Sequence, residues 1–298
     1  MIENNNEKNI NNKLILKEQR NIKLERLFAN PSLIVGFVVF LIILLAALII
    51  PTMSDVDPNA MVVSDRLKPP SSEHFFGTDE FGRDLFTRVL YGARVSLWVG
   101  LSVTFFSCFF GTILGLYASY FKVLDNILMR ICDGLTAIPG ILLAIALTAA
   151  LGTSNKNVII ALTIVYTPSI ARTVRASALV VKEQMYVEAA KVQGASNFRI
   201  LLKLILPGVI SPLTVQASYI FAQAIISEAS MSFLGAGIPA PAASLGNILQ
   251  GSKSVLTKAP WTAIVPGSFV ILCVLSLNLL GDGLRDYFDP RTKRKGKK

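Results

Sequence analysis

Histidine is almost absent from this chain of 298 residues, since His74 is the only one. A single histidine excludes an HExxH protease and any metal site built from several histidines, and it leaves no spare histidine for a Ser-His relay. Cysteine is also rare. Cys108, Cys132 and Cys273 lie far apart inside apolar runs and without metal-ligand spacing, so we expect them to be reduced, buried thiols.

Charged residues are scarce as well, at 16% of the chain against 52% hydrophobic residues. This balance predicts an integral membrane protein. The formal net charge of +10 would suit a nucleic-acid partner if the basic residues formed one folded patch, but they are spread over the segments between apolar runs. We therefore expect a lipid bilayer around the chain and no nucleic acid as a partner.

The N-terminal region carries no evident cleavable signal peptide. Residues 1–30 are polar, and the first apolar run is long and ends without a small-residue cleavage site. The stretch 13–28 mixes basic and apolar side chains, which predicts an amphipathic helix lying on the membrane surface. We expect residues 1–31 to form a cytoplasmic segment before the first span.

Six apolar runs are long enough to cross a membrane, because about 20 helical residues cover a hydrocarbon core of about 30 Å. The expected spans are 32–50, 95–119, 129–151, 157–178, 207–233 and 261–283. Pro139 and Pro168 lie inside the third and fourth spans, where a missing N–H permits a kink. In the second span, Gly111 and Gly115 form a GxxxG pair that lets another helix approach closely.

The distribution of lysine and arginine predicts the orientation. Segments on the N-terminal side of the membrane carry 21 of the 29 basic residues, which favours both termini in the cytoplasm. The fold class is therefore an all-α membrane protein with six transmembrane helices. Its expected parts are the first span with an external loop (32–94), a core of five helices (95–284) that contains a cytoplasmic loop (179–206), and a basic cytoplasmic tail (285–298).

Ionisable residues inside spans are costly in lipid, so each must face protein or water. Arg130 and Asp133 are spaced i,i+3 and can pair on one helix face, although a direct role in a translocation path is also open. Glu228 stands alone in the outer part of the fifth span, where a water-filled path and an interhelix hydrogen bond are equally compatible. Asp282, at the inner end of the last span, is expected at a helix interface.

The segment that begins at Gly246 nearly spells a phosphate-binding P-loop. Ser252 stands where the P-loop lysine belongs, and the segment follows no strand. We therefore expect neither an ATP site nor another cofactor on this chain.

The polar loop 179–206 lies between two spans. Good helix formers run from Val180 to Val192, and Gly194 supplies a break where a left-handed turn is allowed. Ser196 can cap a second helix that reaches residue 206, and Pro207 is expected to separate this helix from the fifth span. Two short helices joined at a glycine form a compact knob, a pattern that is equally typical of an ordinary amphipathic loop.

The amino-acid sequence of the knob also resembles a known family signature. Glu188-Ala189-Ala190, three residues, Gly194, nine residues and Leu204-Ile205-Leu206-Pro207 resemble the EAA signature of permease subunits from ATP-binding-cassette (ABC) importers, with Leu204 where isoleucine is usual. The stretches Phe76-Gly77-Thr78-Asp79, Gly82-Arg83-Asp84, Tyr91-Gly92-Ala93-Arg94-Val95-Ser96-Leu97, Ser232-Phe233-Leu234-Gly235 and Gly281-Asp282-Gly283-Leu284-Arg285-Asp286 with Asp289-Pro290-Arg291 resemble the second permease of the dipeptide, oligopeptide and nickel importers. Leu245 departs from the tryptophan common in that group.

This resemblance implies a type I importer permease fold in a bacterial cytoplasmic membrane. The implied partners are a homologous second permease, two cytoplasmic ATPases that hold ATP and Mg²⁺, and an external substrate-binding protein. The residues implied in ATPase coupling are Glu188, Ala189, Ala190, Gly194, Leu204 and Pro207. The chain itself would not be an enzyme.

The cargo implied by the resemblance is a dipeptide or oligopeptide, with nickel or a metal chelate as the alternative. A self-sufficient ion-coupled carrier is a more remote alternative. It would need coupling groups near mid-membrane and often an internal repeat, whereas Glu228 is the one strong candidate group and no convincing repeat is present. A membrane enzyme is disfavoured because the acidic residues, the cysteines and the histidine are scattered over different segments.

Overall fold

The computed structural model describes residues 30–53 and 56–288. The expected amphipathic helix at 13–28 and most of the basic tail lie outside these residues. Within them the chain is helical, and its one β-type contact is an isolated bridge between Thr78 and Asp84. The expected all-α class is confirmed.

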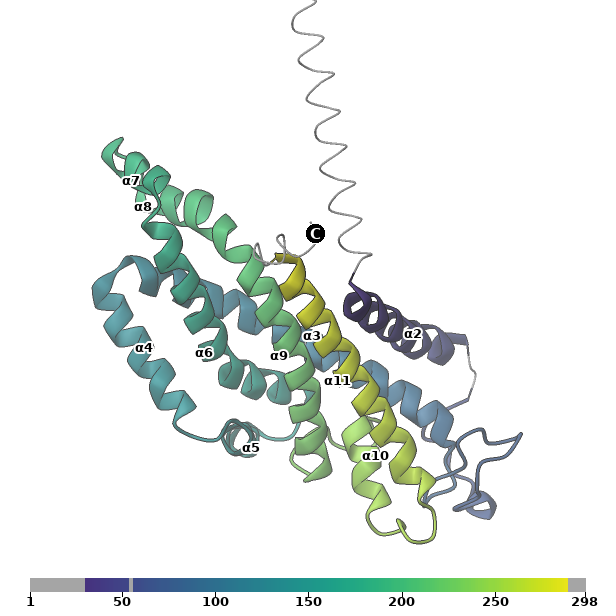
Figure 1. Cartoon of the computed structure of the whole chain (residues 1–298). Coiled ribbons are helices and arrows are strands. Elements are labelled where there is room, and N and C mark those ends of the chain that lie inside the picture. The colour runs from purple at the N-terminus through teal and green to yellow at the C-terminus, as the bar shows by residue number, and fades with distance from the viewer. Residues whose placement is uncertain (1–29, 54–55, 289–298) are drawn as a thin grey trace, which may run out of the picture.

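The main helices pack side by side in one bundle (Figure 1). The long ones are α2 (Pro31–Met53), α3 (Leu85–Tyr120), α6 (Asn155–Lys182), α9 (Leu206–Phe233) and α11 (Trp261–Phe288). The shorter elements are the 3-10 turn η1 (Val63–Asp65), α4 (Lys122–Thr136), α5 (Gly140–Leu151), α7 (Met185–Val192), α8 (Asn197–Arg199), the π-helix η2 (Ile200–Ile205) and α10 (Leu245–Ser252). Figure 1 places α7 and α8 at one end of the molecule and α10 at the other.

Five of the described helices are long and apolar enough to cross a membrane. The expected third span is instead a pair of helices, α4 and α5, bent by 91°. Pro139 stands at the bend as the residue before α5, since it has no N–H with which to continue α4. The count of six expected spans is met when this bent pair is counted as one. Pro168, by contrast, lies within an unbroken α6.

Close packing between α3 and α6 depends on the GxxxG pair. A Cβ added to Gly111 would lie 2.5 Å from the Cβ of Ile170, and one added to Gly115 would lie 2.6 Å from the carbonyl oxygen of Ala171. The two glycines therefore let the helices approach at a distance that no side chain would allow. The expected close approach of another helix is confirmed.

We expect a Gly111→Leu variant to lose stability, because an overpacked core commonly costs about 1–3 kcal/mol. The midpoint temperature of unfolding, measured on the purified full chain in detergent, should fall clearly. Gly134→Leu on α4 is the matched control, since a Cβ added there meets no atom within 4 Å. Equal losses in both variants would show that close α3–α6 packing is not the cause.

The cysteines have the places that their apolar surroundings predict. Cys132 and Cys273 are buried, Cys108 is partly buried, and all three are free thiols. Each therefore serves as a small apolar side chain.

Candidate functional site

The knob is fixed to the helices that precede and follow it. Val187, on the inner face of α7, is fully buried in an apolar cluster with Val174 and Ala178 of α6 and with Ile200 and Ile205 of η2. This cluster joins α7 to α6 on one side and to the start of α9 on the other. A force applied to α7 is therefore passed to two long helices.

Gly194 ends α7 in the left-handed conformation, with a φ of 75°. The Gly194 N–H donates to the carbonyl oxygen of Lys191, and the Ala195 N–H donates to that of Ala190, each at 3.0 Å. These two bonds form a Schellman motif, which favours glycine at this position. A Cβ added to Gly194 would meet nothing within 4 Å, so the backbone conformation, and not space, requires the glycine.

The second half of the knob runs directly into α9. The Ser196 Oγ accepts a hydrogen bond from the Arg199 N–H at 3.4 Å, which caps α8. The Leu206 N–H then bonds to the carbonyl oxygen of Leu201, five residues back, in the wide turn of η2. Pro207 lies in the first turn of α9.

The expectation that Pro207 separates the knob from the span is wrong, because Asn197–Phe233 is one helical run. Proline is tolerated in the first turn of a helix, where its missing N–H interrupts little. The irregular part of the helical run is the π-type turn η2, directly before Pro207. Such turns are frequent at functional sites.

The outer surface of the knob exposes apolar side chains. The exposed fractions are 84% for Met185, 89% for Val192 and 67% for Phe198. Exposed apolar groups on a segment outside the expected spans indicate a surface for a protein partner. Of the predicted coupling residues, Glu188, Ala189, Gly194 and Pro207 are exposed, whereas Ala190 and Leu204 are partly buried.

Tyr120, at the end of α3, contacts the knob and helps to hold it in place. The sequence did not predict this role. The Tyr120 hydroxyl donates to Asn197 Oδ1 at 2.8 Å. The Nζ atoms of Lys182 and Lys191 each lie 5.5 Å from the centroid of its ring. The available signal was an aromatic residue at the boundary of a span, next to a basic loop.

Asp133 does not pair with Arg130. Its Oδ1 accepts a hydrogen bond from Arg172 of α6 at 2.9 Å, and Arg175 one turn later binds Asp125 of α4 through two bonds of 2.5 and 2.6 Å. The i,i+3 pairing expected within α4 is wrong, because a neighbouring helix offers a guanidinium group. Two ion pairs therefore connect α4 to α6.

Glu228 is fully buried within the bundle. Its Oε2 accepts a hydrogen bond from the hydroxyl of Ser96 on α3 at 2.7 Å, and its Oε1 accepts one from Ser232 at 2.8 Å. The hydroxyl of Ser232 in turn accepts from the Ile238 N–H at 3.0 Å. Of the two alternatives for Glu228, this geometry matches the interhelix hydrogen bond. The hydrogen bonds of Glu228 and Ser232 join α3, α9 and the segment after α9.

A Glu228→Ala variant should therefore unfold more easily, since burial of polar groups that lose their partner costs about 1–3 kcal/mol. Glu228→Gln keeps a carbonyl oxygen and the side-chain shape, so it should retain most of the stability. Thermal unfolding of the purified chain compares the two variants. Equal stability of the Ala variant and the original chain would contradict a structural role for the hydrogen bonds of Glu228.

Asp282 and Gly246 both lie where helices meet. Asp282 accepts a hydrogen bond from the hydroxyl of Tyr219, which connects α11 with α9. Gly246 lies in the first turn of α10, where an added Cβ would be 2.4 Å from the carbonyl oxygen of Ala229. Leu245, beside it, is fully buried. Packing of α10 against α9 therefore accounts for Gly246 without a nucleotide.

The loop before α3, which contains Gly77 and Gly82, is held by Asp79. Its Oδ1 accepts hydrogen bonds from the backbone N–H groups of Phe81 at 2.8 Å and Arg83 at 3.0 Å, and its Oδ2 binds Arg83 Nε at 2.6 Å. A Cβ on Gly82, which has a φ of 74°, would lie 1.9 Å from the carbonyl oxygen of Val62. The Gly-Thr-Asp and Gly-Arg-Asp spellings thus specify one tight loop.

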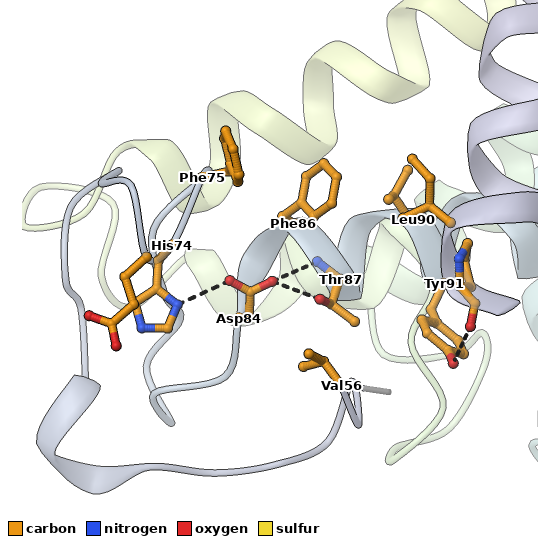
Figure 2. A pocket seen from close by; sticks show the side chains of 11 residues that line it. Val56, His74, Phe75, Asp84, Phe86, Thr87, Leu90 and Tyr91 are labelled. Carbon is orange, nitrogen blue, oxygen red and sulfur yellow. Dashed lines mark hydrogen bonds and ion pairs between the residues drawn. The ribbon is translucent and has the colours of Figure 1, made fainter. Parts of the chain in front are cut away.

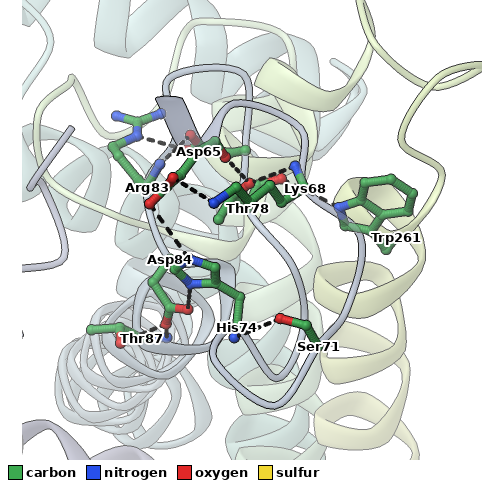
Figure 3. Close-up of polar contacts among 10 residues, drawn as sticks. Asp65, Lys68, Ser71, His74, Thr78, Arg83, Asp84, Thr87 and Trp261 are labelled. Atoms are coloured by element: carbon green, nitrogen blue, oxygen red, sulfur yellow. Dashed lines mark hydrogen bonds and ion pairs between the residues drawn. The ribbon is translucent and has the colours of Figure 1, made fainter. Parts of the chain in front are cut away.

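His74 lies between two carboxylates of this loop (Figure 3). Its Nδ1 is 3.1 Å from Asp84 Oδ1, and its Nε2 is 3.7 Å from Asp65 Oδ2. Asp84 also caps α3, because its Oδ2 accepts bonds from the N–H and hydroxyl of Thr87 at 2.8 Å each. The hydrogen bond from Lys68 holds the pKa of the Asp65 carboxyl below its usual range. His74 therefore helps to position the start of α3.

A cavity of about 250 Å³ adjoins His74 and Asp84 at the end of α2 (Figure 2). Its wall is mostly apolar. Across the described ranges, no group of three or more histidine, cysteine, aspartate or glutamate residues could hold a metal ion.

Comparisons with known proteins agree with this architecture. Residues 108–294 match the family described as binding-protein-dependent transport system inner membrane component, and residues 22–70 match the N-terminal TM domain of oligopeptide transport permease C. A putative peptide transport system permease protein of Brucella abortus biovar 1 is 49% identical over 271 residues, which cover 91% of this chain and 92% of the relative.

Two further relatives carry more specific names. The dipeptide transport system permease protein DppC of Alkalihalophilus pseudofirmus is 43% identical, over 90% of this chain and 89% of the relative. The glutathione transport system permease protein GsiD of Pectobacterium atrosepticum is 46% identical, over 77% of each chain. A chain from an inward-facing structure of the MetNI methionine ABC transporter aligns with a TM-score of 0.51 at 23% identity, covering 65% of this chain and 94% of that chain. This likeness supports the fold.

Proposed function

This chain belongs to the family of binding-protein-dependent transport system inner membrane components, and we propose that it is one permease subunit of an ATP-driven peptide importer. It is a multi-pass protein of the cytoplasmic membrane. Its proposed partners are a homologous second permease, two cytoplasmic ABC-type ATPases and an external substrate-binding protein. The description of the family, which names dependence on a binding protein, supports the last of these.

The knob at 179–206 is the observation that carries the proposal. It combines an exposed apolar tip at Met185, Val192 and Phe198 with a buried anchor at Val187. A cytoplasmic ATPase docks on the tip, and Glu188 offers this partner a charged contact. When the ATPase pair closes or opens, the knob moves as a rigid body and shifts α6 and α9, so that the path opens alternately to the two sides of the membrane.

The chemistry of ATP belongs to the partners in this proposal. ATP and Mg²⁺ bind to the two ATPases, and this chain has no catalytic role. The names of the relatives, all of which are transport permeases, support this division.

A peptide is the cargo that the names of the relatives favour, since they include peptide, dipeptide and glutathione transport. Nickel or a metal chelate stays as the alternative cargo. A chelated metal needs no ligand from the permease, so the lack of a metal-binding cluster in the described ranges does not decide between them.

The proposed orientation places both termini and the knob in the cytoplasm. Support comes from the lysine and arginine distribution. The knob also lies at the end of the bundle where α2 begins and α11 ends (Figure 1). This arrangement fits an orientation in which the knob and both of these helix ends face the same side of the membrane.

Reconstitution in lipid vesicles tests the proposal against a self-sufficient carrier. Vesicles with the second permease, both ATPases and the binding protein should accumulate labelled peptide only when ATP is present on the knob side. Vesicles with this chain alone should accumulate none, with or without an ion gradient. Uptake by the chain alone, driven by a gradient, would overturn the proposal in favour of the carrier.

A further inference from the structure

A wide apolar groove runs along the side of the bundle, with a volume of about 850 Å³. Its apolar walls include Phe40, Leu44 and Leu48 from α2, Leu97 and Leu101 from α3, and Phe221 from α9. All three helices are candidate spans. In the membrane, this groove therefore lies at the depth of the hydrocarbon chains of the lipids.

Two basic side chains line the same groove. Arg94 of α3 and Lys156 of α6 are both exposed, and the groove has no acidic side chain among its lining residues. Neither one forms an ion pair or a side-chain hydrogen bond with any residue that the structure describes. Arg172 and Arg175, in contrast, bind carboxylates on α4.

The two charges lie toward one end of the groove. Arg94 is about 14 Å along α3 from Leu85, at about 1.5 Å for each residue. Lys156 lies in the first turn of α6, which begins at the same end of the bundle. Trp98, 67% exposed, lies one turn after Arg94 on the same helix face, and tryptophan is enriched where hydrocarbon meets the headgroups.

We propose that this groove binds one anionic phospholipid. Its phosphate accepts hydrogen bonds from Arg94 and Lys156, and an acyl chain lies along Phe40, Leu44 and Phe221. An unpaired guanidinium group near hydrocarbon is costly, and a phosphate removes that cost because it matches the planar donor fork of arginine. The bound lipid fills the space between α2 and the core helices, so it acts as part of their packing.

A helix of a second permease is the competing occupant. Such a helix would need an acidic residue opposite Arg94 and Lys156 to satisfy both charges. A phospholipid is present in the membrane at all times and supplies the anion and the apolar chain together. The proposal depends only on the membrane location of the chain and not on its role in import.

The test uses the full chain in phosphatidylcholine vesicles that contain a photoactivatable lipid, either phosphatidylglycerol or phosphatidylcholine, with the reactive group on an acyl chain. Mass spectrometry then maps the labelled residues. Phosphatidylglycerol should label groove residues such as Leu44 and Leu101 much more than phosphatidylcholine does. One basic residue near an anionic lipid surface typically strengthens binding about fivefold. We therefore expect Arg94→Gln or Lys156→Gln to lower this labelling about fivefold, and the double change to lower it about 30-fold.

Two controls complete the design. Lys258→Gln removes an exposed basic residue outside the groove and should leave the labelling unchanged. Arg94→Lys keeps the positive charge and should retain most of the labelling by phosphatidylglycerol. Equal labelling by the two lipids, or a double variant that labels like Lys258→Gln, would overturn the proposal. Loss of the labelling in the assembled importer, with cross-links from the groove to the second permease, would overturn it in favour of the competing occupant.

Discussion

A Gly194→Val variant is expected to enter the membrane and assemble with its partners, yet to lose peptide uptake by about fivefold or more. The φ of 75° at this position is a conformation in which a β-branched residue is strained by about 1–3 kcal/mol. That cost is enough to lower the population of the present turn about 5- to 150-fold. Because an added Cβ meets no neighbour, the spans themselves should stay folded.

Gly194→Asn is the matched control, since asparagine tolerates the left-handed conformation better than valine does. It should retain much of the uptake. Membrane content and co-purification of the ATPases establish that both variants assemble, and labelled-peptide uptake is then compared at equal amounts of complex. Normal uptake by an assembled Gly194→Val complex would show that the shape of the knob is not needed for coupling.

A Val192→Asp variant should bind the ATPase at least 30-fold more weakly. Val192 is 89% exposed at the tip of the knob, so the change should leave the folding of the isolated chain intact. In the proposed interface, however, the new carboxylate is buried without a partner, and a change at the centre of an interface commonly costs about 2 kcal/mol or more. The affinity of the purified ATPase for the reconstituted permease pair is the measurement.

Val63→Asp is the control for this substitution. It makes the same chemical change at a residue that is 78% exposed in η1, in the loop before α3 and far from the knob in the chain. ATPase affinity should be unchanged in this variant. If Val63→Asp weakens binding as much as Val192→Asp, or if neither change has an effect, the knob is not the docking surface.

The span boundaries were predictable where a run of apolar residues ends sharply. The expected fifth span, 207–233, differs by one residue from α9 (Leu206–Phe233). The predicted second span, 95–119, began too late, because α3 begins at Leu85. Residues 85–94 were assigned to the external polar loop, and they include Arg88. In the structure Arg88 is 4% exposed and donates to the carbonyl oxygen of Pro58, a partner 30 residues away that periodicity does not reveal.

The position of the break in the third span was predictable from Pro139, but its size was not. Proline removes one hydrogen bond and so marks where a helix can bend. The 91° angle depends on how α5 packs against other helices. The partner of Asp133 was hidden for the same reason, since Arg172 comes from α6 and is 39 residues away in the chain.

The local geometry of the knob was easier to predict than its connection to the bundle. A glycine after a helix and a serine two residues later are local signals, and the turn and the cap that they predict are both present. The support from Tyr120 and the wide turn of η2 depend on tertiary contacts. The surface of the knob was therefore predictable from local signals, whereas its attachment to α3 and α9 was not.

The most direct test of the account is to identify what touches the tip of the knob in the assembled importer. A photo-crosslinking amino acid in place of Val192 should capture one of the ATPases, and the same group in place of the exposed Phe75, in the loop before α3, should not. Capture of the ATPase from Phe75, or capture of only the second permease or the external binding protein from Val192, would contradict the account.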